Sequence, residues 1–453
     1  MASFAAASLP EITGGFWLDG IMPSGELGIS TDTRGDNRGM IFFALSGERF
    51  DAHDFLEQAV VSGCEALCIK REKRSCIPGG IPVLLVDDPL LAMQACAGFH
   101  RRRFPELTVL GVTGSVGKTS VKEMLRAICA GAAGENAVLC TAGNTNNQIG
   151  VAQNLLKLTR QHRYAVIEAG TSSPGEIAPL STMMYPSGAI VNSIAPCHLE
   201  NLIDLDGVAR EKGCIYQAMP ENSPAVFPLD TAGKAELTKA AAGHRIITFG
   251  SSDQADISAS FKGGDLSGSS FELKFPDGSF FTVSWHLTGS HNALNAAGAA
   301  ALAYASGIAP EIIAGALPDT SLPGMRMKKS VLDGVTFFND AYNANPASMR
   351  ASVELLASAQ PEGRLIMLLG GMRELGDISP AEHRILLEYI GEKLPEAIVM
   401  TIGPEFAGIS ENHFADPEAA GKFLKSLLRP GDTVFAKGSR GNAVEKALPP
   451  EAR

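Results

Sequence analysis

The feature that most constrains this chain is the segment GVTGSVGKTS at residues 111–120. An apolar stretch beginning at residue 107 runs into this glycine-rich turn, and residues 121–130 continue with apolar side chains at helical spacing. A strand, a glycine-rich turn and a helix in this order are typical of a phosphate-binding loop, where backbone N–H groups and a helix N-terminus face one anion. The segment therefore predicts a nucleoside triphosphate site, with ATP as the expected ligand.

Within this loop, Lys118 is expected to neutralise the β- and γ-phosphates and the Thr119 hydroxyl to hold Mg²⁺. The spacing departs from the usual G-x-x-x-x-G-K-[ST] pattern, because Val112 stands at the first glycine position. The loop alone leaves open whether the γ-phosphate serves a kinase, an ATPase-driven switch or a ligase that forms an acyl phosphate. The residues expected to contact the nucleotide are Gly111, Thr113, Gly114, Ser115, Val116, Gly117, Lys118, Thr119 and Ser120.

The length of 453 residues predicts about three domains, all of the α/β class. Residues 1–105 mix short apolar runs with a helix-like stretch at 53–62. Residues 106–318 alternate strands and helices as in a doubly wound sheet, with a β-rich insert around the turn Pro276-Asp277-Gly278. Residues 319–453 predict a small Rossmann-like domain with strands at 364–371, 396–403 and 432–439.

Finer local predictions follow from single residues. The basic cluster from His100 to Arg103 is interpreted as a solvated linker between domains. Asn345 is expected to cap a helix that has Pro346 at its first position, and Ser379 to Glu382 reads as a capping box. The most apolar stretch, 296–318, is expected to form a buried helix, a loop and a second helix, because Pro310 and Glu311 interrupt it.

Composition limits the classes of partner. The net charge of −11 argues against a general nucleic-acid coat protein or a binder of anionic membranes. Eight cysteines without CxxC spacing indicate a reducing compartment, and the N-terminal residues lack the pattern of a signal peptide. We therefore expect a soluble cytoplasmic protein. The charge balance and the absence of a long heptad seam are compatible with a monomer.

Beyond the loop, several segments resemble the Mur ligases, the ATP-dependent amide ligases of peptidoglycan precursor synthesis. The general family resemblance lies in TAGNTNNQIGVAQNLL (141–156), IVNSIAPCHLENLIDLDGVAREKGCIY (190–216) and GSHNALNAAGAA (289–300). Other segments resemble, more narrowly, the branch that adds D-alanyl-D-alanine: DAYNANPASM (340–349), LGGMRELG (369–376), KGSR (437–440) and the N-terminal STDTRGDNRGMIFFALSGERFDAHDF (30–55). These segments occur in all three predicted domains.

The resemblance implies an enzyme that joins D-alanyl-D-alanine to a UDP-N-acetylmuramoyl-tripeptide through an acyl phosphate and a tetrahedral intermediate, giving the pentapeptide, ADP and phosphate. It implies that the first domain binds the uridine nucleotide, the second ATP and the third the dipeptide. One alternative is a sister ligase that adds meso-diaminopimelate, lysine or glutamate; DAYNANP and MRELG favour the dipeptide. Another is a nucleotide-binding regulatory protein without turnover, against which the intact site residues argue.

The resemblance also implies roles for residues of the central domain. Thr119 and Glu168 would hold one Mg²⁺, and His198 with Glu168 a second. Lys212 matches a lysine that the family carries as a carbamate, which makes it an anion able to ligate or orient at Mg²⁺. With Lys118, the residues Glu168, His198 and Lys212 are the expected catalytic set. Independently, Glu168 ends an apolar strand at its carboxyl end, where doubly wound sheets place ligands.

Further nucleotide and substrate contacts come from the same resemblance. His291 and Asn295, four residues apart on one helix face, would lie near adenine. Arg326 and Asp340 would reach ATP only when the C-terminal domain swings over the loop. The expected substrate-binding residues are Thr33, Arg34, Ser46, Gly47, Asn144, Asn146, Asn147, Tyr342, Asn343 and Asn345. Lys437 and Arg440 follow a strand and either face the anionic substrates or stay solvated.

The resemblance has two departures. Gly371 stands where this branch usually carries Asp, so a role for that acid does not carry over. Ala341 stands where Ser is common, which matters little if only the turn is needed.

Overall fold

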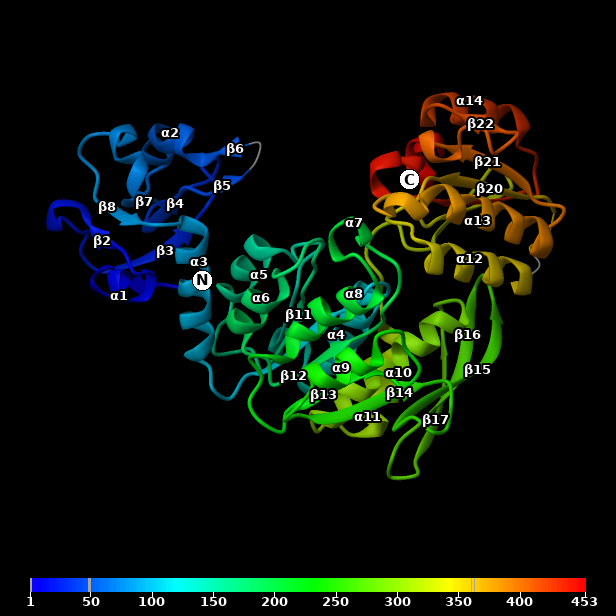
Figure 1. Cartoon of the computed structure of the whole chain (residues 1–453), viewed down its shortest axis with the longest axis horizontal. Helices are drawn as coiled ribbons and strands as arrows, with labels where there is room; N and C mark the ends of the chain where they lie inside the picture. Colours follow the sequence, from blue (N-terminus) through cyan, green and yellow to red (C-terminus); the bar gives the residue numbers. More distant parts are fainter. Residues whose placement is uncertain (1, 48–49, 360, 362) are drawn as a thin grey trace.

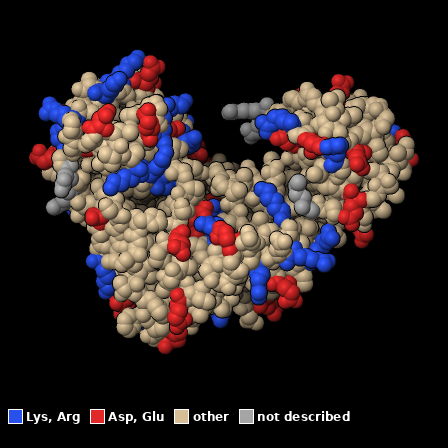
Figure 2. All heavy atoms as spheres, turned by 180° about the vertical axis from the view of Figure 1, so that it is seen from behind, with Lys and Arg blue, Asp and Glu red and all other residues tan. Residues whose placement is uncertain are grey.

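The computed structural model describes residues 2–47, 50–359, 361 and 363–453. Each of the three predicted domains contains one large sheet. Figure 1 shows the N-terminal and C-terminal lobes on opposite sides of the central one. The space-filling view in Figure 2 shows an open hollow between the two outer lobes and a surface on which both signs of charge are interspersed.

The N-terminal sheet has the order β1-β3-β4-β7-β8-β2, and its four inner strands are parallel. The helix-like stretch predicted at 53–62 is confirmed by a 3₁₀ turn (Ala52–Phe55) followed by α2. A two-stranded hairpin, β5 (Ser46–Gly47) and β6 (Phe50–Asp51), stands apart from the main sheet. The other elements are β1 (Phe4–Ala5), α1 (Leu9–Thr13), β2 (Phe16–Trp17), β3 (Glu26–Ser30), β4 (Met40–Phe43), α2 (Leu56–Val61), β7 (Ala66–Lys70), β8 (Val83–Val86) and α3 (Pro89–Arg102).

Helix α3 joins this lobe to the central one, and it corrects the interpretation of the basic cluster as a solvated linker. His100 and Arg101 are both buried, each with 4% of its surface exposed. The Arg101 guanidinium donates to the carbonyls of Met184, Phe104, Leu107 and Tyr185 at 2.8–3.3 Å. A buried guanidinium needs acceptors for its N–H groups, and these four backbone carbonyls supply them.

The central sheet has the order β10-β11-β9-β12-β13-β14-β15-β16-β17 and is parallel as far as β15. Helices α4, α10 and α11 share one hydrophobic core with one face, and α5, α6 and α8 cover the other together with α3. The strands are β9 (Thr108–Thr113), β10 (Val138–Cys140), β11 (Tyr164–Glu168), β12 (Gly188–Val191), β13 (Pro224–Pro228), β14 (Arg245–Gly250), β15 (Ile257–Asp265), β16 (Gly268–Lys274) and β17 (Phe280–Trp285).

The predicted β-rich insert is an extension of this same sheet. Strands β15, β16 and β17 pair antiparallel at its edge, with the expected turn between the last two. The apolar stretch 296–318 forms the predicted pair of helices, the end of α10 and all of α11. The central helices are α4 (Lys118–Ala133), α5 (Gln148–Leu155), α6 (Ile177–Met184), α7 (Leu199–Leu202), α8 (Leu205–Gly213), α9 (Lys234–Ala240), α10 (Ser290–Ala305) and α11 (Pro310–Ala316).

The C-terminal sheet has the order β18-β19-β23-β20-β21-β22, with only the β18–β19 pair antiparallel. Its three predicted strands are confirmed as β20, β21 and β23. Its elements are β18 (Lys328–Leu332), β19 (Val335–Asn339), α12 (Pro346–Ala359), β20 (Leu365–Gly370), α13 (Ser379–Lys393), β21 (Ile398–Ile402), β22 (His413–Phe414), α14 (Pro417–Leu427) and β23 (Thr433–Lys437).

The two predicted caps in this domain have different outcomes. The Asn345 side chain accepts from the Ser348 N–H at 2.9 Å, so the cap of α12 is confirmed. The capping box at Ser379 is wrong, because a 3₁₀ turn leads directly into α13 and no side chain caps the helix there. Ser379 instead offers its carbonyl to His383 Nδ1 at 2.7 Å.

In the part of the chain that the structure describes, no helix combines the length and the apolarity needed to cross a bilayer.

The buried Arg101 generates a stability prediction. Arg101→Met keeps an aliphatic stem but leaves carbonyls at the domain junction without a donor. We expect this change to destabilise the fold by about 2–4 kcal/mol and to lower the thermal unfolding midpoint by several degrees. Arg102→Met is the matched control, because Arg102 is exposed on the same helix. Equal midpoints for both variants in differential scanning calorimetry would contradict the role given to Arg101.

Candidate active site

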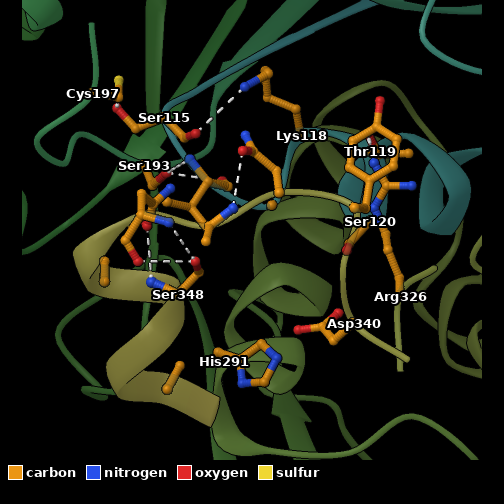
Figure 3. Close-up of a pocket in the computed structure, with 18 of the residues that line it drawn as sticks. Ser115, Lys118, Thr119, Ser120, Ser193, Cys197, His291, Arg326, Asp340 and Ser348 are labelled. Atoms are coloured by element: carbon orange, nitrogen blue, oxygen red, sulfur yellow. Dashed lines mark hydrogen bonds between the residues drawn. The ribbon is translucent and has the colours of Figure 1, made fainter. Parts of the chain in front are cut away.

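A cleft of about 1630 Å³ lies between the central and C-terminal domains. One wall carries the glycine-rich loop, and the other carries the segments that follow β19, β20 and β23. Figure 3 shows side chains from both domains pointing into this cavity. Predicted residues that line it are Ser115, Val116, Gly117, Lys118, Thr119, Ser120, Asn144, Asn146, Asn147, Glu168, His198, His291, Asn295, Arg326, Asp340, Tyr342, Asn343, Asn345, Lys437 and Arg440.

The loop follows β9, which lies between β11 and β12 where the strand order reverses. Such a switch point opens a crevice at the carboxyl ends of the strands, so the loop sits where an α/β sheet places its ligand. Gly117 has a φ of 81°, and a Cβ there would lie 2.6 Å from Asn192 Nδ2 and 2.5 Å from Asn295 Oδ1. Only glycine fits this position, and α4 then begins at Lys118.

The segment after β12 supports the loop from the side. Ser193 Oγ accepts from the Val116 N–H at 2.8 Å, and Asn192 Nδ2 donates to the Val116 carbonyl at 2.9 Å. Lys118 Nζ donates to the Gly114 carbonyl at 2.8 Å, which holds the ammonium over the curled backbone. The loop is therefore a rigid nest of N–H groups with one cation beside it, an arrangement suited to phosphate.

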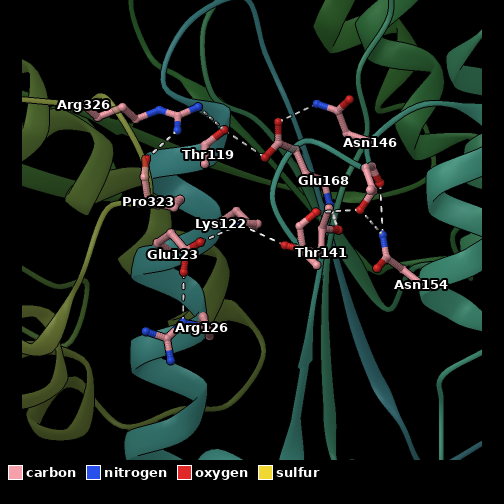
Figure 4. A network of polar contacts seen from close by, with 12 residues as sticks. Thr119, Lys122, Glu123, Arg126, Thr141, Asn146, Asn154, Glu168, Pro323 and Arg326 are labelled. Carbon is pink, nitrogen blue, oxygen red and sulfur yellow. Dashed lines mark hydrogen bonds and ion pairs between the residues drawn. The ribbon is translucent and has the colours of Figure 1, made fainter. Parts of the chain in front are cut away.

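Beside this nest, Thr119 and Glu168 form the oxygen-rich part of the site (Figure 4). Thr119 Oγ1 donates to Glu168 Oε2 at 3.1 Å, and Asn146 Nδ2 donates to Glu168 Oε1 at 2.8 Å. The Glu168 carboxylate ends β11 and is only 1% exposed. The predicted pairing of a loop hydroxyl with a strand-end carboxylate is thus present in the geometry.

Arg326 corrects one expectation. The resemblance implies that Arg326 reaches the nucleotide only when the C-terminal domain swings over the loop. In the structure, Arg326 Nη2 already donates to Thr119 Oγ1 at 3.1 Å. Its guanidinium also stacks on the Tyr342 ring, 3.8 Å from the ring centroid. The reason is that Arg326 belongs to the segment connecting the two domains, between Asp319 and β18, which lies against the loop.

A second layer of buried charge lies behind Glu168 (Figure 4). Lys122, 1% exposed on α4, pairs with Glu123 at 2.6 Å and donates to the Thr141 carbonyl at 2.9 Å. The Thr141 hydroxyl in turn accepts from the Glu168 N–H at 2.9 Å. These contacts tie α4 to the ends of β10 and β11, and they fix the backbone from which Glu168 projects.

His198 meets the C-terminal domain. Its Nδ1 lies 2.6 Å from Glu374 Oε2, and both residues have positive φ, 52° and 64°. The His198 imidazole lowers the pKa of Glu374, so this carboxyl is ionised at neutral pH. Because Glu374 engages Nδ1, Nε2 is the His198 ring nitrogen that is left without a partner among the described residues.

Lys212 lies on α8 behind the cleft and is 1% exposed. Within the described chain, its Nζ has no protein acceptor at hydrogen-bond distance. Burial first and the nearby charge of Lys118 second lower the pKa of Lys212 to about 8. A substantial neutral fraction near physiological pH is unusual for lysine and makes the amine nucleophilic.

His291 and Asn295 both line the cleft from α10, as their spacing predicted. Burial lowers the pKa of His291, which keeps the imidazole neutral. Asn295 Oδ1 accepts from Asn192 Nδ2 at 2.9 Å. Figure 3 places His291 close to Asp340 of the C-terminal domain, so residues from two domains meet at this end of the cleft.

On the C-terminal wall, the predicted residues fall into two groups. Asp340 pairs with Lys437 and accepts from the Met327 N–H at 3.2 Å, so Lys437 is buried rather than solvated. Arg440 is exposed and pairs with Glu445 at 3.0 Å. Asn345 acts as the helix cap described above, whereas the Asn343 side chain accepts from the neighbouring Ala344 N–H at 2.9 Å.

Some predicted residues lie outside the cleft. Gly111 and Thr113 are inside β9, and the Thr113 hydroxyl donates to the carbonyl of Ala169, the residue after β11, at 2.8 Å. Their position inside the strand does not support a contact with the nucleotide. Gly114 is likewise not part of the lining.

The residues predicted to bind the uridine nucleotide lie on the loop after β3 and in the β5–β6 hairpin of the N-terminal domain. Arg34 forms a two-pronged pair with Asp32, and the Ser46 hydroxyl donates to Asp51 at 2.8 Å. Gly47 belongs to the small hairpin, and Thr33 is half-buried next to Arg34. None of the four lines the large cleft.

The sequence prediction missed three site residues. Asn192 and Ser193 hold the loop, and Glu374 holds His198. Asn192 and Ser193 directly follow a predicted strand. Their position at its carboxyl end indicates a ligand-binding site in a doubly wound sheet, so the sequence could have identified them. No local signal marks Glu374, because its partner is 176 positions earlier in the chain.

Comparison with known families gives two matches. Residues 112–303 match the model described as the Mur ligase middle domain. Residues 325–440 match the model described as the Mur ligase, glutamate ligase domain. Together the two models cover both walls of the cleft.

Known proteins match over nearly the whole chain. The UDP-N-acetylmuramoyl-tripeptide--D-alanyl-D-alanine ligase of Escherichia coli K12 is 36% identical over 432 residues, 93% of this chain and 92% of the relative. A crystal structure of MurF from Acinetobacter baumannii has a TM-score of 0.91 and 33% identity, covering 99% of this chain and 98% of that one. MurF ligase from Thermotoga maritima, in complex with ADP, has a TM-score of 0.82 and 26% identity over 93% and 96% of the two chains. The predicted three-domain α/β architecture is confirmed.

The geometry of the loop predicts how nucleotide binding depends on Lys118. Lys118→Ala removes the cation beside the nest of N–H groups, and we expect the dissociation constant of Mg-ATP to rise about 10- to 100-fold. Isothermal titration calorimetry measures this directly. Lys157→Ala, an exposed lysine on the central domain, is the control and should bind as the unmodified protein does. Unchanged affinity in Lys118→Ala would refute the placement of the phosphates.

Proposed function

The chain belongs to the Mur ligase family, and we propose that it is the ligase that joins D-alanyl-D-alanine to UDP-N-acetylmuramoyl-tripeptide in peptidoglycan synthesis. The observation that carries this proposal is similarity over nearly the full length, 36% identity across 93% of the chain, to a ligase of that name. The cleft supplies what such a reaction requires: a phosphate loop on one wall and a second domain facing it.

The first step of the proposed reaction activates a carboxylate, which is a poor electrophile. The cleft brings the γ-phosphate of ATP to the carboxylate of the tripeptide, and phosphoryl transfer gives an acyl phosphate and ADP. Two cations lie where negative charge would accumulate during this step. Lys118 lies beside the loop, and Arg326 donates to the Thr119 hydroxyl. Fixed cations in a partly enclosed cleft stabilise such charge more than they do in water.

The residues present fit Mg²⁺. The Thr119 hydroxyl and the Glu168 carboxylate are 3.1 Å apart, and oxygen donors of this kind are those that Mg²⁺ prefers. Mg²⁺ usually keeps several waters and substrate phosphates as ligands, so one or two protein oxygens are enough to hold it. Thr119 and Glu168 would hold the ion, and His198 Nε2 would reach a second one. The ions would supply charge neutralisation between the two anionic substrates.

In the second step, the amine of the dipeptide attacks the acyl carbon and forms a tetrahedral intermediate. Collapse of that intermediate expels phosphate and leaves the new amide. We propose that Lys212 is a carbamate, which would be an anion able to ligate or orient at Mg²⁺. A buried ammonium close to Lys118 is repelled by it, whereas a carbamate anion in the same place is attracted by it.

The three lobes divide the substrates in this proposal. Residues 1–105 hold the uridine nucleotide, with Thr33, Arg34, Ser46 and Gly47 as its contacts. Residues 106–318 hold ATP, with His291 and Asn295 near adenine and Asp340 near the ribose. Residues 319–453 hold the dipeptide, together with Tyr342 and Asn343, and the amides of the segment Asn144 to Asn147 face the tripeptide.

We also propose that the chain works as a monomer in the cytoplasm. The charge balance and the lack of a long heptad seam are compatible with a monomer, and all eight cysteines are free thiols. Light scattering at working concentration tests the monomer.

The assay that tests the function measures phosphate release from Mg-ATP with UDP-N-acetylmuramoyl-tripeptide, with and without D-alanyl-D-alanine. We expect phosphate release that requires both the tripeptide and D-alanyl-D-alanine. The product should be heavier than the tripeptide substrate by the mass of D-alanyl-D-alanine less one water. Release with a single amino acid in place of the dipeptide would identify a sister ligase. Nucleotide binding without release under any combination would identify a regulatory protein.

The carbamate has its own test. Lys212→Ala is expected to abolish turnover, and added formate or acetate is expected to restore part of it by supplying an anion in the vacated space. Carbon-13 NMR of the unmodified protein in labelled bicarbonate should show a carbamate signal that the variant lacks. The signal should grow as pH rises through about 8, because neutral amine is the reactive form. Full activity in Lys212→Ala would rule out the carbamate role.

A further inference from the structure

Three glycines on the C-terminal wall surround one polar cluster. A Cβ built at Gly371 would overlap the Glu405 carboxylate, and one at Gly403 would lie 2.7 Å from Glu405 Oε2. A Cβ at Gly441 would overlap the guanidinium of Arg373. The strands and loops here lack side chains at the three places where Glu405 and Arg373 need room.

The cluster is built around Arg373. Its Nη2 donates to Asn442 Oδ1 at 3.2 Å, and its Nε lies 3.7 Å from Glu405 Oε1. Asn442 is itself fixed, because its Nδ2 donates to the Gly371 carbonyl at 2.6 Å. The backbone N–H of Arg373 donates to Ser439 Oγ at 3.0 Å. Backbone and side chain of Arg373 are therefore both held from behind.

The cluster is closed on one side and open on the other. The Glu405 side chain is 16% exposed and its Oε2 is buried without a partner in the described structure, whereas Arg373 is 49% exposed. Arg373 and Gly441 line the cleft, but Glu405 does not. A carboxylate behind a guanidinium sets the plane of that guanidinium, so Arg373 presents an oriented edge to the cleft.

Two other cations of this wall are already engaged in ion pairs. Lys437 is paired with Asp340, and Arg440 Nη1 is paired with Glu445 at 3.0 Å. Arg373 Nη1 has no acceptor within the described residues. Lys118 and Arg326, the cations assigned to phosphate, are attached to the loop on the opposite wall. Arg373 is thus a cation of the C-terminal wall that is held in a fixed orientation and has an N–H group available for a further anion.

We propose that Arg373 binds the terminal carboxylate of the incoming D-alanyl-D-alanine and that Glu405 and Asn442 position it. This inference rests on the proposed function and names a specificity determinant of its acceptor site. Of the three substrates, the dipeptide carries its carboxylate at the end opposite to the amine that reacts. A planar guanidinium matches a carboxylate with two parallel hydrogen bonds.

The spacing along the wall is consistent with this role. Glu374, the next residue after Arg373, contacts His198 at the reacting end of the cleft. Consecutive Cα atoms are about 3.8 Å apart, and an extended dipeptide spans at most about 7 Å. A dipeptide whose amine lies near His198 can therefore place its carboxylate beside Arg373.

The test compares D-alanyl-D-alanine with its C-terminal amide, which lacks the carboxylate charge. In the unmodified protein, the KM of the amide should exceed that of the acid about 10- to 100-fold. Arg373→Gln should raise the KM of the acid by a similar factor, leave that of the amide nearly unchanged, and leave the KM of ATP and of the tripeptide unaltered. Arg384→Gln, exposed on α13, is the control and should retain the discrimination.

The positioning role has a separate variant. Glu405→Gln keeps the size of the side chain and removes its charge, so it should raise the KM of the acid severalfold, with kcat and the thermal unfolding midpoint close to those of the unmodified protein. A fall in kcat or midpoint without a change in the acid-to-amide ratio would make Glu405 merely structural and overturn its positioning role.

The outcomes separate this inference from the function on which it rests. No turnover by the unmodified protein with any dipeptide would refute the proposed function itself. Turnover with equal KM values for acid and amide would refute carboxylate recognition while the ligase stands. Discrimination that survives Arg373→Gln, or a rise in the KM of ATP instead of the dipeptide, would overturn the assignment of Arg373.

Discussion

The hydrogen bond between the Thr119 hydroxyl and the Glu168 carboxylate is the contact on which the rest of the site depends. It joins the first turn of α4 to the end of β11, and Arg326 of the domain connection donates to the same hydroxyl. A carboxylate that is 1% exposed requires such partners, because an unpaired buried charge is costly. Strand end, phosphate loop and connecting segment therefore take their relative places from one small group of polar atoms.

Charge in the cleft is local and strongly arranged, although the chain as a whole carries −11. On the wall that carries the loop, backbone N–H groups and a few cations provide positive charge. On the C-terminal wall, Asp340 and Glu405 pair with Lys437 and Arg373 and fix the orientation of these cations. Lys212 is the exception, since it is a buried cation beside another cation. An anion formed on its amine would turn that repulsion into attraction, which gives the proposed carbamate a physical reason independent of any relative.

The two outer lobes are coupled to the central one in different ways. The N-terminal lobe is anchored through α3, where Arg101 is buried against carbonyls of the central domain. The C-terminal lobe contacts the centre through polar contacts at the cleft, such as His198 with Glu374, and through Leu266, which packs against its hydrophobic core. Polar contacts of this kind can break and form again during turnover, whereas a buried core resists movement. The C-terminal lobe, which forms one wall of the cleft, is thus the part of the molecule suited to open and close.

By itself, the sequence determined whatever depends on neighbours along the chain: the phosphate loop, the strands around it, the cap at Asn345 and the carboxylate at the end of β11. It failed where the decisive partner is distant. Burial of Arg101 depends on carbonyls more than 80 residues away, and the orientation of His198 depends on Glu374. Only the tertiary structure decided that Gly371 makes room for Glu405, because hydrogen bonds and steric fit act through space while sequence patterns report only spacing along the backbone.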